Sequence, residues 1–215
     1  IRHTGDNNTF VRHFQLVPGN DRLQQITIGQ TTLDYTYDAN GNMTRETLSR
    51  HYEWNFADQL RVFRMQTANA EPSIYAHYLY DAAGQRTKKL VRKQGGRIEV
   101  TVYIDGMFEY QRIVQGAAEQ ENNTLHIMDN QSRIALLRIG DPFTGDNTPA
   151  VKYHLGDHLG SSQVVLNNTG NLISREEYTP CGETSFGSFA KKRYRFTGKE
   201  RDEESGLNYH SARYY

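Results

Sequence analysis

The sequence predicts an all-β fold built from short hairpins, on three observations. Tyrosines alternate with other residues in short stretches, Gly is frequent in turn contexts, and one motif recurs along the chain. The 215 residues include 14 Tyr and 18 Gly, and hydrophobic residues make up 36%. This composition is too aromatic for a disordered chain and unusually polar for a single compact core. It suits half-exposed strands, on which a tyrosine ring packs while its hydroxyl reaches water.

The recurring motif is clearest in two places. Tyr35-Thr-Tyr37-Asp38-Ala-Asn-Gly41 is repeated as Tyr78-Leu-Tyr80-Asp81-Ala-Ala-Gly84, and a second alternating strand is expected after each copy. The alternating tyrosines predict a strand with its rings on one face. The Asp side chain is expected to bond the backbone of the turn, and the Gly three residues later to supply a positive φ.

Weaker copies of the motif extend the repeat along the chain. Its aspartates step by 20, 23, 24, 24 and 28 residues, and Thr179 takes the Asp place in a last copy with Gly182. The full set of expected turn aspartates is Asp38, Asp58, Asp81, Asp105, Asp129 and Asp157, the last with Gly160. Such hairpins are marginal alone, so neighbours are expected to pair edge to edge. The best helix candidate, residues 117–123, is short and polar and is interpreted as a loop.

The motif resembles the Rhs/YD-repeat family, whose consensus turn is Tyr-Asp-x-x-Gly followed by a basic strand. Residues 153–215 make the resemblance more specific, because they are similar to the Rhs repeat-associated core domain. The similarity lies in three motifs in this order: Tyr153-His-Leu-Gly-Asp-His-Leu-Gly-Ser-Ser, Tyr178-Thr-Pro-Cys-Gly-Glu and Arg195-Phe-Thr-Gly-Lys-Glu-Arg-Asp. Cys181 and Thr179 depart from the family's usual residues. The resemblance implies YD-repeat hairpins over residues 1–150, forming a spiral sheet. The N-terminal part of the core domain is then expected over residues 151–215, within a longer protein.

The resemblance also implies a function. Rhs proteins and C components of toxin complexes form a hollow shell that encapsulates a C-terminal toxin, and the core domain of many members is an aspartyl autoprotease. We expect the remainder of the shell, the toxin and a B-component-like chain as partners, in a bacterial protein that is secreted or on the cell surface. The alternative is a cell-surface scaffold that binds carbohydrate or mediates adhesion.

The autoprotease resemblance assigns candidate catalytic residues. Asp202 would be one of two carboxyls that share a proton, with Arg201 nearby to hold charge. The second Asp and the cut site are expected downstream of Tyr215, so no enzymatic activity is expected of this chain itself. The alternative is a purely structural role, in which Asp202 closes a turn or pairs with a basic neighbour.

Other sites are disfavoured by local chemistry. His154, Asp157 and His158 are metal-ligating types, but the flanking glycines predict a turn in which the histidines diverge, so no metal is expected. The basic, aromatic run at residues 191–196 is followed at once by acidic residues, which disfavours nucleic acid. The 25 Lys and Arg balance 25 Asp and Glu, so no net charge attracts the chain to nucleic acid or to an anionic membrane. No cofactor is expected, and no apolar run is long enough for membrane insertion by this segment.

Overall fold

The computed structural model describes residues 2–3, 10–47, 49–130, 132–188, 192–211 and 213–214. The chain forms two compact units, Ile1–His77 and Tyr78–Tyr215. The two units meet between residues 77 and 78. The expected boundary at residues 150–151 divides the chain by family resemblance instead of by compactness, and it stays a prediction. Within the described ranges the ordered elements are strands and one 3-10 turn, so the predicted all-β class is confirmed. No helix among these residues is long and apolar enough to cross a membrane.

The first unit is an antiparallel meander in which consecutive strands pair with each other. Its buried side chains come from β6, β7 and β8, where Tyr52 lies opposite Phe63 with ring centroids 5.5 Å apart and Leu60 is fully buried. Its strands are β1 (Arg2–His3), β2 (Phe10–Leu16), β3 (Leu23–Ile28), β4 (Thr31–Tyr37), β5 (Met43–Glu46), β6 (Arg50–Trp54), β7 (Leu60–Met65) and the first residues of β8 (Ile74–Tyr80).

The second unit continues with antiparallel strands, each from β9 onward paired with the next as far as β17. They are β9 (Arg86–Lys93), β10 (Arg97–Ile104), β11 (Phe108–Gln115), β12 (Ala118–Asp129), β13 (Ser132–Ile139), β14 (Val151–Gly156), β15 (Ser162–Leu166), β16 (Leu172–Tyr178) and β17 (Thr184–Ser188). After them come the 3-10 turn η1 (Phe196–Gly198) and a small sheet of β18 (Glu200–Arg201), β19 (Asn208–His210) and β20 (Arg213–Tyr214).

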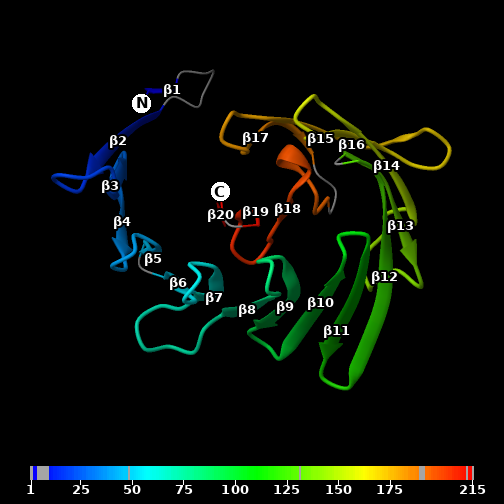
Figure 1. The fold of residues 1–215 in the computed structure, drawn as a ribbon, viewed down its shortest axis with the longest axis horizontal. Coiled ribbons are helices and arrows are strands. Elements are labelled where there is room, and N and C mark those ends of the chain that lie inside the picture. The colour runs from blue at the N-terminus through cyan, green and yellow to red at the C-terminus, as the bar shows by residue number, and fades with distance from the viewer. Residues whose placement is uncertain are drawn as a thin grey trace. The chain divides into compact units, whose positions relative to one another are not determined.

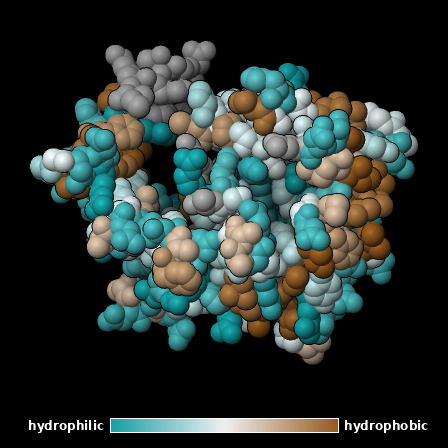
Figure 2. Space-filling view, in the orientation of Figure 1, coloured by the Kyte–Doolittle hydropathy of each residue, from teal (hydrophilic) through white to brown (hydrophobic). Residues whose placement is uncertain are grey.

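The sheet of the second unit curves around its own C-terminal segment, residues 192–214 (Figure 1). Figure 2 shows hydrophobic residues gathered on the outer side of β12–β14, where Ile127, Ile134, Tyr153 and Leu155 are exposed. The inner face carries charged and polar side chains instead, among them Lys89, which is buried. The unit is therefore closed by ion pairs and hydrogen bonds as much as by apolar contacts.

The five-residue turns follow the geometry of the Tyr-Asp-x-x-Gly motif. At Asp38, Asp81 and Asp157 the backbone NH of the Gly three residues later donates to the Asp carbonyl, at 3.0–3.2 Å. One carboxylate oxygen accepts from the NH four residues later, at 2.8–2.9 Å. The glycines have positive φ: Gly41 (96°), Gly84 (80°) and Gly160 (78°). Thr179 holds the corresponding position through its hydroxyl, which accepts from Glu183 NH.

Three of the expected turn aspartates, Asp58, Asp105 and Asp129, do not open a five-residue turn. Asn55 opens the first of these turns, and Asp58 takes the Gly place with φ 56°. Asp105 is a central residue of a tighter turn that Met107 NH closes on the Ile104 carbonyl, and Asp129 ends β12. Asn and Asp both cap such turns and both tolerate positive φ, so spacing alone misassigned them. A further turn, opened by Asn167 with Gly170, was not predicted.

The segment interpreted as a loop, residues 117–123, is instead the start of the long strand β12. Its polar side chains pair across the hairpin: Arg112 contacts Glu119, and the Tyr110 hydroxyl donates to Glu121 at 2.7 Å. Cross-strand polar pairs stabilise an exposed hairpin without an apolar pattern, which explains why the pattern predicted a loop.

Candidate functional site

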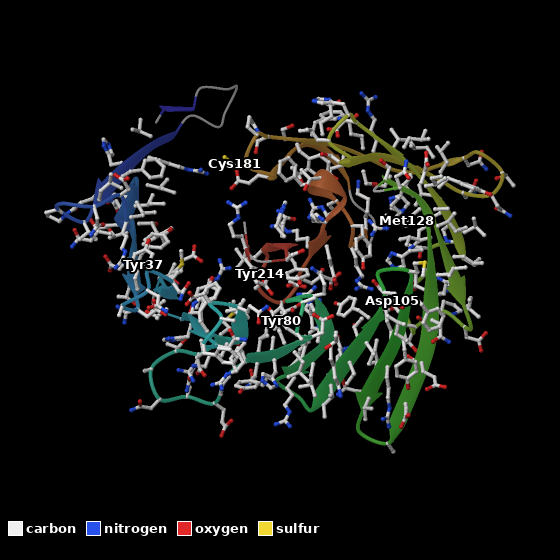
Figure 3. All side chains as sticks on the ribbon, in the orientation of Figure 1. Tyr37, Tyr80, Asp105, Met128, Cys181 and Tyr214 are labelled. Carbon is white, nitrogen blue, oxygen red and sulfur yellow. The ribbon has the colours of Figure 1, made fainter. Side chains whose placement is uncertain are left out.

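The candidate site is the contact between the C-terminal segment and the inner face of the second unit. Hydrogen bonds join the segment to strands throughout this sheet, from Tyr80 on β8, whose hydroxyl lies 2.9 Å from that of Tyr214 (Figure 3), to Glu176 on β16. Because these residues are far apart in sequence and lie on one face, the segment fills the inner side of the curve (Figure 1). Three buried ionic groups hold it there.

The first group surrounds Asp202, which is fully buried. Arg86 Nη1 donates to one carboxylate oxygen and Lys89 Nζ to the other, each at 2.7 Å. The same two cations also contact Glu200, at 2.7 and 3.0 Å. Arg86 lies beneath Tyr209, with its guanidinium carbon 4.1 Å from the ring centroid. Two cations from β9 thus neutralise two adjacent carboxylates of the segment, and this pairing offsets the cost of removing the charges from water.

Glu204 belongs to the edge of this group. It accepts from the Tyr78 hydroxyl at 2.8 Å, and Lys89 Nζ lies 3.6 Å from its other oxygen. Burial raises the pKa of Glu204, and the nearby Asp202 charge raises it further, while Lys89 opposes both. The site therefore combines a carboxylate held by two cations with a carboxyl that takes up a proton more readily than usual.

The second group centres on Glu109 of β11. Arg193 Nη1 donates to it at 2.7 Å, His126 Nε2 lies at 3.1 Å, and the Tyr194 hydroxyl also donates to it. Burial alone would raise the pKa of Glu109, but the Arg193 charge and these contacts lower it to about 2. Arg193 also contacts Glu200, so the first two groups are connected through one side chain.

The third group centres on Glu176 of β16. Arg195 and Lys192 of the segment contact its carboxylate, together with the hydroxyls of Thr184 and Tyr178. Burial would raise the pKa of Glu176, but the hydrogen bonds from Arg195 and its neighbours lower it to about 2. The segment is thus fixed at both of its ends.

The sequence-predicted site residues are only partly brought together. Asp202 lies at the centre of the first group, but the cations that contact it come from β9. Arg201 forms a backbone hydrogen bond to the Arg193 carbonyl, and its side chain lines a cavity. The catalytic role of Asp202 and Arg201 stays a prediction.

His154, Asp157 and His158 are divided between a strand and a turn. His154 on β14 is buried and bonds to Ser162, whereas Asp157 opens the adjacent turn and His158 lies within that turn. Among the residues that the structure describes, no three His, Cys, Asp or Glu side chains are grouped so as to hold a metal ion.

The sequence is similar to two bacterial toxin subunits. The chain is 28% identical over 232 residues to toxin subunit YenC1 of Yersinia entomophaga, and 27% identical over 236 residues to toxin subunit YenC2 of the same organism. Both alignments cover 100% of this chain and 24% of the relative, so the chain spans about a quarter of the length of these subunits. No protein-family model matches the sequence.

The fold has a solved counterpart. The chain superposes on the crystal structure of TcdB2-TccC3-TEV with a TM-score of 0.74 and 22% identity, covering 96% of this chain and 12% of that one. The chain is therefore similar in sequence to two toxin subunits and shares its fold with part of that crystal structure.

The sequence analysis did not identify the β9 cations as partners of Asp202. Arg86 and Lys89 were identified only as part of the basic strand that follows the turn. A signal was present, because Lys89 shares its strand face with the buried Val91. A basic residue on the same strand face as a buried apolar residue is expected to have an ionic partner, because Lys and Arg are rarely buried unpaired.

Proposed function

We propose that this chain is part of the β-sheet shell of a Rhs or toxin-complex-type protein that encloses a C-terminal toxin. The observation that carries the proposal is the C-terminal segment bound on the inner face of the curved sheet through buried ion pairs. The similarity to YenC1 and YenC2 supports a toxin-complex role. The biochemical task of such a wall is containment, and this chain itself is not an enzyme in this proposal.

Residues 151–215 would be the N-terminal part of an Rhs repeat-associated core domain. In this proposal Asp202 is one member of a pair of carboxyls, and Arg86 and Lys89 bind its two oxygens. The second carboxyl and the cleavage site would lie after Tyr215. One carboxylate would activate water while the other carboxyl donates a proton, as in other aspartyl proteases.

The proposed partners follow from the same family. They are the rest of the shell, an enclosed toxin, and a B-component-like chain, since the structural counterpart is a TcdB2-TccC3 assembly. A secreted or cell-surface location is proposed on the same grounds. No nucleic acid, cofactor or membrane insertion by this segment forms part of the proposal.

The test is the intact mass of the full-length protein and of its Asp202→Asn variant. We expect the native protein to be recovered as two pieces that remain associated, and the variant as one. Glu177→Gln is the matched control, because it removes an exposed contact with Arg175 on the same unit, leaves the buried groups intact and should still cleave. If the native protein stays whole while folding as β-sheet, the cleavage role is wrong and a passive surface scaffold is favoured. If all three proteins cleave, Asp202 has only a structural role.

A further inference from the structure

A cavity of about 350 Å³ lies within the second unit, between the inner face of its sheet and the C-terminal segment. Its lining includes Arg138, Phe143, Lys152, His154 and Tyr194. A cavity of this size accommodates a small organic molecule. Most of the residues that line it are charged or polar, while apolar atoms make up the larger part of its exposed wall.

Three nitrogen-bearing side chains occupy neighbouring positions in this wall. Lys152 on β14 lies opposite Leu136 on β13, and Arg138 is two residues further along β13. His154 is two residues beyond Lys152. In an antiparallel pair, residues two apart share a face and diagonal neighbours are within reach of long side chains. Arg138, Lys152 and His154 therefore face the cavity as one group.

These side chains are incompletely paired by the part of the chain that the structure describes. His154 is 7% exposed, and its buried Nε2 has no hydrogen-bond partner there. The buried Nε of Arg138 also has none, and the Lys152 amine makes no hydrogen bond or ion pair with those residues. Leaving buried polar atoms unpaired costs free energy, so such atoms indicate a bound polar group.

The hydrogen bond between His154 and Ser162 allows the other ring nitrogen to act as a donor. Its Nδ1 lies 2.7 Å from Ser162 Oγ. With the hydroxyl donating to Nδ1, the neutral ring carries its proton on Nε2. Burial and the charges of Arg133 and Lys152 lower the pKa of His154 to about 3, so the ring is neutral at pH 7.

The local charge is positive. Asp146 is the carboxylate beside this group; it lies 3.6 Å from Arg138 Nη1 and also accepts from Thr148 NH at 2.9 Å. Burial lowers the pKa of Lys152, and Asp146 only partly compensates. The other buried cations of the cavity are bound to carboxylates: Lys89 to Asp202, Arg193 to Glu109 and Lys192 to Glu176. Asp146 can therefore balance only one of the two positive charges of Arg138 and Lys152.

The geometry points to an anion-binding site in this cavity, in which Arg138, Lys152 and the Nε2 of His154 bind the carboxylate or phosphate group of a small molecule. Arg and Lys supply charge-assisted hydrogen bonds, and His154 adds a neutral donor. These three residues are not members of the Asp202 group, although Lys89 and Glu204 of that group line the same cavity, and the site does not depend on cleavage. Succinate and inorganic phosphate are suitable probes, since they distinguish the two sources of the anionic group.

The experiment is isothermal titration of the full-length protein with each probe at pH 7 and constant ionic strength. We expect saturable binding of at least one probe, and a loss of about tenfold or more in affinity in Lys152→Met, as for a removed charged hydrogen bond. Arg175→Met is the matched control, because Arg175 is an exposed strand residue of the same unit paired with Glu177, and it should bind like the native protein.

Hydrogen exchange of the native protein with and without the probe keeps the proposal testable if Lys152→Met does not fold. Added anion should increase amide protection in β13 and β14 above that in β9 and β10. Absence of saturable binding by both probes would overturn the site. So would binding that Lys152→Met leaves unchanged, or protection that is spread evenly over the unit.

Discussion

Arg86 Nη1 on β9 lies 2.7 Å from Asp202 Oδ2, and neither side chain is more than 1% exposed. This contact joins residues 116 positions apart. A buried ion pair of this kind contributes little net stability compared with apolar residues, but it becomes costly when one partner is removed. The C-terminal segment therefore depends on each member of the group.

Replacement of Arg86 by Met should destabilise the protein strongly. The substitution leaves Asp202 and Glu200 with one cation fewer in a site without water access, which costs about 3–5 kcal/mol for a broken buried pair. Urea unfolding monitored by circular dichroism measures the change. Arg112→Met removes an exposed pair with Glu119 and should have only a small effect. Equal effects of the two substitutions would contradict the importance of burial.

Glu176 should make stability depend on pH under acid conditions. Its pKa falls from the ordinary 4.5 to about 2 in the folded state. A depressed folded pKa gives stability that is complete above pH 4.5 and is lost as pH falls from there towards 2. The urea midpoint of the native protein should decrease over this window more steeply than that of Glu176→Gln. Parallel curves would show that Glu176 does not hold the segment in this way.

The turn at Asp157 should be sensitive to its glycine. Gly160 has φ 78°, and a Cβ there would meet no other atom within 4 Å, so backbone strain alone determines the cost. We expect Gly160→Ala to lower the free energy of unfolding by about 1–2 kcal/mol. Gly160→Asn should cost less, because Asn tolerates the left-handed region. Thermal unfolding of both variants checks the order, and a larger loss in the Asn variant would refute the strain argument.

Cys181 should react in the folded protein. It is the one cysteine of the sequence, and it lies exposed in the turn opened by Thr179. A thiol reagent should therefore label one equivalent at the same rate with or without denaturant below the unfolding transition. Labelling that appears only on unfolding would place this turn in a buried contact.

Local features were the most predictable from the sequence. The hairpins at Asp38, Asp81 and Asp157 follow from an Asp and a Gly three residues apart, since the bonds that form the turn lie within five residues. The copies at Asp58, Asp105 and Asp129 were misassigned because Asn55 can replace Asp and two-residue turns share the same residue types. In these turns the identity of the opening residue matters less than its position.

The candidate site was less predictable for a different reason. Asp202 was identified through family resemblance, but nothing near it in sequence indicates Arg86 or Lys89. The curvature of the sheet brings β9 and β16 to the same C-terminal segment. Because these contacts join residues far apart in the chain, no local sequence pattern indicates them. Only the position of Lys89 two residues before Val91, on the same face of the strand, indicated that Lys89 is buried. This spacing does not identify the residue that pairs with it.

The contacts of the C-terminal segment also determine the order of folding. Strands β9 to β16 pair with their immediate neighbours through short connections, whose closure costs little entropy. The contacts of Asp202 with Arg86 and Lys89 close loops of more than 100 residues, and they need β9 already in place. During synthesis from the N-terminus the sheet can therefore assemble first, with its inner charges still hydrated. Docking of residues 192–214 then completes the unit, so the emergence of this segment, rather than sheet formation, sets the moment at which the unit becomes fully stable.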